Sequence, residues 1–157
     1  MKRRSILRAG MAMFLEPAGT VQILFTTVAA PDLASGDAIR IAAGKVDLQD
    51  TIVASHTIGL YRLGGAVDED YNLLFGNTTP RFGVISAGAH DVSGDPRFAQ
   101  PASDDYHLTP GSAAVDAGVD AGVNVDIDGQ PRPQGKGFDI GYDELAFFQV
   151  RLPAIRR

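Results

Sequence analysis

The sequence has no cysteine and no tryptophan among its 157 residues. The lack of cysteine excludes disulfide bonds and thiolate metal sites. The lack of tryptophan, with aromatic residues at only 8%, argues against a dedicated sugar-binding platform, because such platforms stack aromatic rings on the sugar. No Gly-x-Ser-x-Gly motif occurs either, so the chain has no nucleophile elbow of the α/β-hydrolase type.

The chain also lacks an excess of basic residues, with 14 Lys and Arg against 19 Asp and Glu and a net charge of −5. Proteins that bind nucleic acid usually carry a basic stripe, so we expect no nucleic-acid partner. No run of about 18 apolar residues is present, and we expect no membrane-spanning helix. With 45% apolar residues, 18 glycines and 9 prolines, the composition favours one turn-rich, all-β domain.

What the sequence does contain is a repeated segment with a Gly-x-Val opening. Its three copies are "GTVQILFTTVA" from Gly19, "GKVDLQDTIVA" from Gly44 and "GAVDEDYNLLF" from Gly65. Short period-2 alternation punctuated by glycine is typical of strands, and a period of 21 to 25 residues fits a β-solenoid in which equivalent strands stack in parallel. We therefore predict that the strands around Val21, Val46 and Val67 stack in register, with Gly44 and Gly65 in structural roles.

A second column of the repeat consists of short polar side chains, Thr26, Thr51 and Asn72. Such side chains commonly bond to nearby backbone groups at turns. We expect this column to mark a turn or to form an inner polar ladder between adjacent coils, and either is a structural role.

Four motifs follow one another in the tail: "SGDPRF" (93–98), "DYHLTPGSAAVDAG" (105–118), "DIDGQPRPQG" (126–135) and "DIGYDE" (139–144). In this order they resemble the C-terminal region of right-handed parallel β-helix proteins that carry a choice-of-anchor Q domain. The similarity covers roughly residues 19–145. It departs from the usual Ser-Pro of that family at Ser112-Ala113, which affects one turn.

This resemblance implies an all-β fold, a right-handed parallel β-helix of about three coils with a loop-rich C-terminal cap. It divides the chain into an atypical N-terminal segment (1–18), the coils (19–90), a choice-of-anchor Q-like cap (91–145) and a tail (146–157). It also implies a bacterial protein that is extracellular or on the cell surface. Members of the family normally have many more coils, so we expect this chain to be a fragment of a longer β-helix.

Two groups of residues are candidates for Ca²⁺, the one cofactor that the sequence suggests. Asp47 and Asp68 share a column of the repeat, so stacking would bring their carboxylates together, either as a solvated acidic face or as a site for Ca²⁺ or a sugar. Asn124, Asp126 and Asp128 in "NVDIDG" match the first half of a calcium loop. Gly135 stands where such a loop needs its twelfth-position Glu, which argues against an EF-hand.

A structural reading of the same motif is open. In that reading Asp128 and Gly129 form a tight turn, and Arg132 pairs with a buried acid, either Asp116 or Asp139. The three histidines, His56, His90 and His107, are not spaced as a local metal site. We expect core or loop roles for His90 and His107.

No acid and base pair at a plausible catalytic spacing is evident, so we assign no catalytic residue. The leading hypothesis is a non-catalytic scaffold or weak glycan-binding surface, with polysaccharide as its partner. Two alternatives stay open: a fragment of a polysaccharide lyase or glycoside hydrolase of the β-helix class, and an adhesin-like module. Open strand edges at the N-terminal end predict self-association.

Overall fold

The computed structural model describes residues 12–146, and within them the protein is all-β. Residues 12–146 contain no α-helix, only a single turn of 3-10 helix, η1, at Pro101–Ser103. The predicted all-β class is confirmed. Every strand pair in the two larger sheets is parallel.

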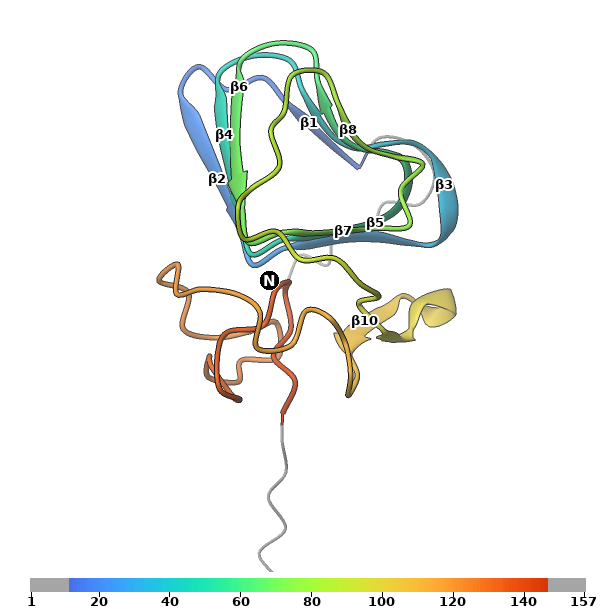
Figure 1. The fold of residues 1–157 in the computed structure, drawn as a ribbon, viewed down its shortest axis with the longest axis vertical. Coiled ribbons are helices and arrows are strands. Elements are labelled where there is room, and N and C mark those ends of the chain that lie inside the picture. The colour runs from blue at the N-terminus through green and yellow to red at the C-terminus, as the bar shows by residue number, and fades with distance from the viewer. Residues whose placement is uncertain (1–11, 147–157) are drawn as a thin grey trace, which may run out of the picture.

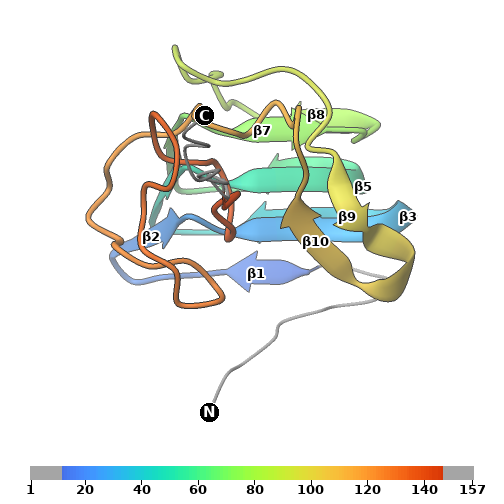
Figure 2. The same cartoon turned by 90° about the horizontal axis from the view of Figure 1, so that it is seen from below.

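Eight strands build the layered part of the molecule, and from β1 to β7 they alternate along the chain between two sheets (Figure 1). They are β1 (Met13–Leu15), β2 (Thr20–Leu24), β3 (Thr27–Ile41), β4 (Lys45–Gln49), β5 (Ile52–Arg62), β6 (Ala66–Asp70), β7 (Leu73–Phe75) and β8 (Thr79–Phe82). One sheet has the order β2-β4-β6 and the other β1-β3-β5-β7, with β8 also paired to β5. Figure 2 shows successive passes of the chain as layers, with β1 at one end and β7 and β8 at the other.

The register of the three-stranded sheet is the one that the repeat predicts. Val21 pairs with Val46, and Val46 pairs with Val67. Because residues alternate between the two faces of a strand, this register places Val21, Val46 and Val67 on the same face of the sheet, the one that points to the interior. The buried interior is therefore apolar, formed by Ile23, Val28, Ala38, Ile39, Ile41, Val46, Leu48, Val53 and Leu60.

The corner after each strand of this sheet uses a left-handed backbone. Phe25, Asp50 and Tyr71 have φ of 43°, 51° and 55°, although none is glycine. The polar ladder predicted beside these corners is confirmed for Asn72, whose amide oxygen accepts the Thr51 N–H while its amide group donates to the Leu48 carbonyl. The Thr51 hydroxyl bonds instead within its own layer, to the carbonyl of Gln49.

Gly44 and Gly65, for which the sequence predicts structural roles, lie where the chain passes close to the preceding layer. Both have positive φ, 70° and 67°. A side chain on Gly44 would collide with the carbonyl of Pro17, and one on Gly65 would collide with the carbonyl of Gly44. Only glycine fits where the layers approach so closely.

The layered part extends slightly beyond the predicted range 19–90. β1 lies within the segment 1–18 that the sequence sets apart, and it pairs with β3 through Met13 and Ile39. At the other end, the chain returns from β8 and reaches Val92, which forms a parallel bridge with Leu73. The predicted tail lies, except for Ala146, outside the described residues.

The remaining residues, 93–146, are rich in turns, as predicted for the cap. Their only strands are β9 (Phe98–Gln100) and β10 (Asp105–Leu108), which form an antiparallel hairpin. This cap lies alongside β5 and β7 rather than over the end of the layers (Figure 1). Its contact is a second apolar cluster, in which Ile52, Ala54 and Leu73 of the sheet meet Leu108, Ala114 and Ile140 of the cap.

Candidate functional site

The outer face of β2-β4-β6 brings the predicted pair of carboxylates together. Asp47 and Asp68 are direct neighbours in the register. The Lys45 ammonium lies between them, 2.8 Å from an oxygen of each, and hydrogen bonds with Asp47 and then Asp68 raise the pKa of Lys45. A shallow open groove of about 350 Å³ runs along this face, which we call the outer polar face. Calcium binding here stays a prediction. The Lys45 ammonium already balances the charge of the two carboxylates, so a calcium ion would have to displace it.

The "NVDIDG" segment forms the tight turn of the structural reading. Gly129 has φ of 81° and its N–H donates to the carbonyl of Asp126. The buried carboxylate of Asp126 accepts the N–H groups of Asp128 and Gln130 through one oxygen and that of Glu144 through the other. Asp126 therefore organises the turn with both oxygens, while calcium binding by Asn124, Asp126 and Asp128 stays a prediction.

Arg132 is buried and paired with an acid, but the predicted partner was wrong. Its guanidinium binds Glu144, at 2.9 Å between Nη1 and Oε1, not the carboxylate of Asp116 or Asp139. Those two carboxylates are held by backbone donors, since Asp139 accepts the N–H groups of Asp116 and Leu145 and Asp116 accepts those of Lys136 and Gly137. Arg132 also lies over the Phe25 ring, 4.4 Å from its centre, and so joins cap to layers.

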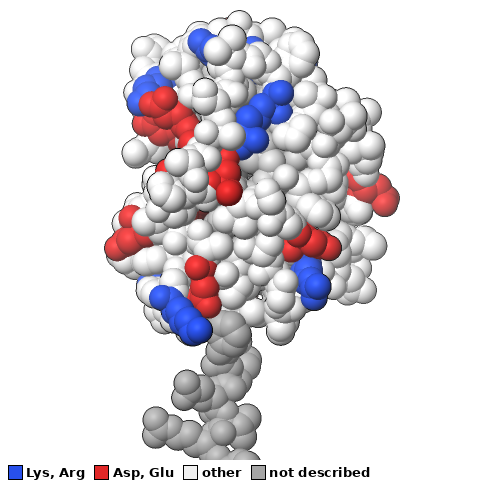
Figure 3. All heavy atoms as spheres, viewed as in Figure 1, with Lys and Arg blue, Asp and Glu red and all other residues white. Residues whose placement is uncertain are grey.

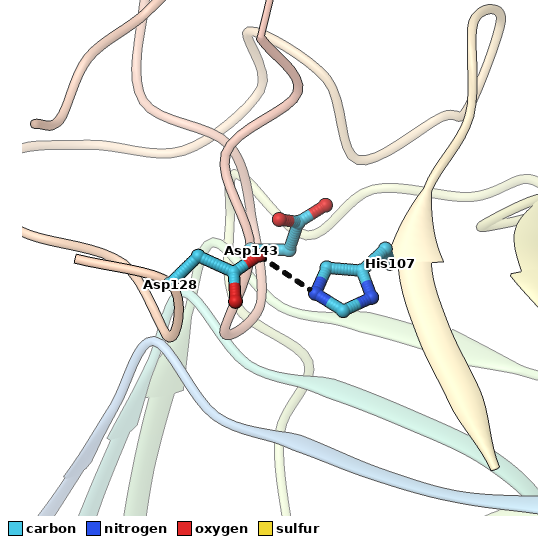
Figure 4. A group of neighbouring side chains, drawn as sticks. All are labelled: His107, Asp128 and Asp143. Carbon is cyan, nitrogen blue, oxygen red and sulfur yellow. Dashed lines mark hydrogen bonds and ion pairs between the residues drawn. The ribbon is translucent and has the colours of Figure 1, made fainter. Parts of the chain in front are cut away.

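A cluster of one histidine and two aspartates lies in the cap (Figure 4). His107 comes from β10, Asp128 from the tight turn and Asp143 from the last described segment. One ligand atom from each lies within 4.8 Å of the others. The His107 ring places Nε2 3.0 Å from Asp128 Oδ2 and Nδ1 2.5 Å from Asp105 Oδ1, so both ring nitrogens face carboxylates.

The electrostatics of this cluster are dominated by negative charge. Asp143 is buried and accepts the Leu108 N–H at 2.7 Å, and its burial raises the pKa of Asp143. Burial of the ring lowers the pKa of His107, but the hydrogen bond with Asp105 and the charges of Asp143 and Asp128 outweigh it, so this pKa lies above its usual value. No sequence pattern indicates this grouping, because its members are far apart along the chain and follow no repeat.

A second ionic cluster closes the last layer. Arg81 binds Glu69, at 2.5 Å between Nε and Oε1, and also Asp91. Arg81 and Asp91 border a hollow of about 360 Å³ at that end of the layers. Burial raises the pKa of Glu69, whereas the hydrogen bond from Arg81 lowers it. Glu69 also accepts a bond from Asn72, so this cluster ties three successive segments of the chain together.

The other two histidines have separate environments. His56 is buried with Nδ1 2.8 Å from the Ala54 carbonyl, and burial lowers its pKa. His90 is exposed, pairs with Asp70 and stacks on the Tyr71 ring. On the face seen in Figure 3, acidic and basic side chains lie next to each other in small groups on a mostly uncharged surface.

Comparison with protein-family models found no matching family, and comparisons with curated proteins and with solved structures found no similar protein. No helix within residues 12–146 has the length and hydropathy needed to cross a membrane.

Proposed function

We propose that this chain is the C-terminal part of a bacterial, extracellular or surface-exposed right-handed parallel β-helix protein with a choice-of-anchor Q-like cap. In this proposal the chain is a non-catalytic scaffold whose outer polar face binds glycans weakly. The observation that carries the proposal is the in-register parallel stacking of Val21, Val46 and Val67 around one apolar interior. A stack of this kind presents the same column of side chains in every layer, which is suited to an extended ligand.

The scaffold role is supported by how the buried ionic groups are used. Glu69 is paired with Arg81, and Glu144 is paired with Arg132. In Asp126 and in Asp139, both carboxylate oxygens accept hydrogen bonds from backbone N–H groups. A general acid or base needs an oxygen that can reach a substrate, and these carboxylates are committed to holding the fold.

The glycan-binding role is supported by the chemistry of the groove on the outer polar face. Gln22, Lys45, Asp47, Gln49 and Asp68 line it, together with Asp70. Amide, ammonium and carboxylate groups can both donate to and accept from sugar hydroxyls. The groove is open and offers no aromatic ring among its lining residues, so the expected affinity is weak, with Kd on the order of 1 mM.

The test is binding of the full chain to a panel of neutral and uronic-acid polysaccharides, by calorimetry and by NMR. Ultraviolet lyase and reducing-sugar assays are run on the same panel with and without Ca²⁺. We expect weak binding that the double variant Asp47→Ala/Asp68→Ala abolishes and that the control Asp32→Ala, at an exposed acid on β3, leaves unchanged. No turnover is expected.

Two results would overturn parts of this proposal. Turnover that disappears in the Asp47→Ala/Asp68→Ala variant would replace the scaffold by an enzyme of the polysaccharide lyase or glycoside hydrolase type. Absence of binding to every polysaccharide in the panel would remove the glycan-binding role and leave the scaffold alone.

A further inference from the structure

We propose that His107, Asp128 and Asp143 bind a divalent transition-metal ion, such as Zn²⁺ or Mn²⁺, that fastens the cap. This site is separate from the outer polar face and differs from the calcium loop that the sequence suggests, because only Asp128 belongs to both.

The geometry gives the ion three ligands from three segments. The donor atoms lie within 4.8 Å of one another, and Figure 4 shows the Asp128 and Asp143 carboxylates on the Nε2 side of the His107 ring. Ligand bonds of about 2.0–2.2 Å place the donors of a tetrahedral ion about 3.3–3.6 Å apart. Side-chain adjustments of up to about one ångström would therefore let all three donors reach one ion.

A neighbouring carboxylate holds the histidine in the orientation that a metal ligand needs. Asp105 Oδ1 lies 2.5 Å from His107 Nδ1. In metal sites a carboxylate on one ring nitrogen commonly fixes the tautomer and directs the other nitrogen at the ion. Here that arrangement leaves Nε2 facing Asp128. The Tyr142 ring packs edge-on against the imidazole at 5.6 Å and limits its rotation.

The charge of the site is an independent argument for a cation. Asp143 is only 5% exposed, and within residues 12–146 it has no ion pair with a lysine or arginine. Within the same residues, Asp105 and Asp128 each form an ion pair with His107 and with no lysine or arginine. Three carboxylates thus surround one imidazole, and burying a carboxylate without a counter-charge is costly. A divalent ion supplies that charge, and solvent reaches it beside the exposed Asp128.

The mixed donor set selects the kind of ion. Imidazole nitrogen with carboxylate oxygens suits Zn²⁺, Mn²⁺ or Co²⁺, whereas Ca²⁺ and Mg²⁺ take oxygen ligands. Because the ligands come from β10, from the tight turn and from the segment after Ile140, the ion would cross-link parts of the cap that share little regular structure.

The test uses the full chain, stripped with a chelator and titrated separately with Zn²⁺, Mn²⁺, Co²⁺ and Ca²⁺. Calorimetry should give one transition-metal site per chain, Co²⁺ should give a visible absorption band, and Tm should rise by about 5–10 °C at ion concentrations about 100 times Kd. Ca²⁺ should give neither a comparable heat nor a comparable rise.

Three variants make the result specific. Asp128→Asn changes an exposed side chain and should abolish the shift in Tm without unfolding the protein, and Asp143→Asn should do the same while still accepting the Leu108 N–H. The control His90→Ala removes a histidine and aspartate pair elsewhere and should keep the shift. An unchanged response in Asp128→Asn and Asp143→Asn, loss of the response in His90→Ala, or an equal response to Ca²⁺ would overturn the proposal.

Discussion

At the scale of single residues, Asp50 is a buried carboxylate whose hydrogen bonding is incomplete. It occupies a left-handed corner and is fully buried. One carboxylate oxygen accepts the Val119 N–H, but the other has no hydrogen-bond partner. Burial raises the pKa of Asp50 to about 6, while the Val119 N–H and the charge of Arg132 act in the opposite direction. The ionised form of Asp50 is therefore a cost of the native fold at neutral pH.

Asp50→Asn should raise the free energy of unfolding by about 1–3 kcal/mol at pH 7.5. The native pKa is above the unfolded value of about 4, so the native state binds more protons between pH about 4 and 6 and stability falls as pH rises through that window. Asparagine tolerates the left-handed backbone and still accepts from Val119. Urea unfolding at pH 4.5 and 7.5 measures both the gain and the flatter pH dependence.

Asp139→Asn is the matched contrast to this change. Burial also raises the pKa of Asp139 to about 6, but its two oxygens accept the N–H groups of Asp116 and Leu145. An amide would leave one of those donors unpaired, so no gain is expected. A pH dependence that Asp50→Asn leaves unaltered would show that Asp50 does not ionise at a cost.

At the scale of elements, two asparagines fasten the last layer to the one below it, Asn72 just before β7 and Asn77 just before β8. Asn72 accepts the Thr51 N–H at 2.9 Å and donates to the Leu48 carbonyl at 3.0 Å. Asn77 repeats this one corner later, with the His56 N–H and the Val53 carbonyl. These bonds satisfy backbone groups at the corners, where the ladder between strands is interrupted. They also fix which residues lie above one another.

Asn72→Ala should lower the free energy of unfolding by about 3 kcal/mol, because it leaves the Thr51 N–H and the Leu48 carbonyl unpaired in the interior. Asn77→Ala should cost less, about 1 kcal/mol, because Asn77 is only half-buried and water can replace its amide. Chemical denaturation of the two variants gives the comparison. Equal losses would mean that burial does not set the value of these bonds.

At the scale of the whole molecule, one wall of the layered part is apolar on both faces. Val53 points into the interior cluster, whereas its neighbours Ile52 and Ala54 pack against the cap. A parallel sheet buried on both faces depends on what covers it. The cap is therefore part of the support of β5 and β7 and not a separate appendage.

Ile140→Ala should lower the stability of the layered part together with that of the cap, by about 2–4 kcal/mol. Ile140 is fully buried in the cluster between them, whereas the control Ile127→Ala changes a cap residue that is 45% exposed and should cost less than about 0.5 kcal/mol. The coupling between the cap and the layered part is measured by thermal unfolding together with hydrogen exchange of the β5 amides. Protected β5 amides after the cap has melted would show that the two parts unfold separately.

Self-association through the N-terminal strand edges stays a prediction. β1 and β2 are at that end of the layers (Figure 2). Concentration-dependent sedimentation of the full chain would test it.

The sequence by itself determined the parts of this protein that follow from local periodicity. The alternation in the Gly-x-Val repeat indicated the parallel register of Val21, Val46 and Val67, and the Asp128-Gly129 pair indicated a tight turn. Only the tertiary structure decided that Glu144 pairs with Arg132, that Lys45 lies between Asp47 and Asp68, and that His107, Asp128 and Asp143 meet. The physical reason is that strands stacked about 4.8 Å apart place equivalent positions of successive repeats next to each other. The neighbours of a residue in the sheet can therefore be found by aligning the repeats. In the cap, which has no repeat, the path of the turns alone determines which distant side chains come together.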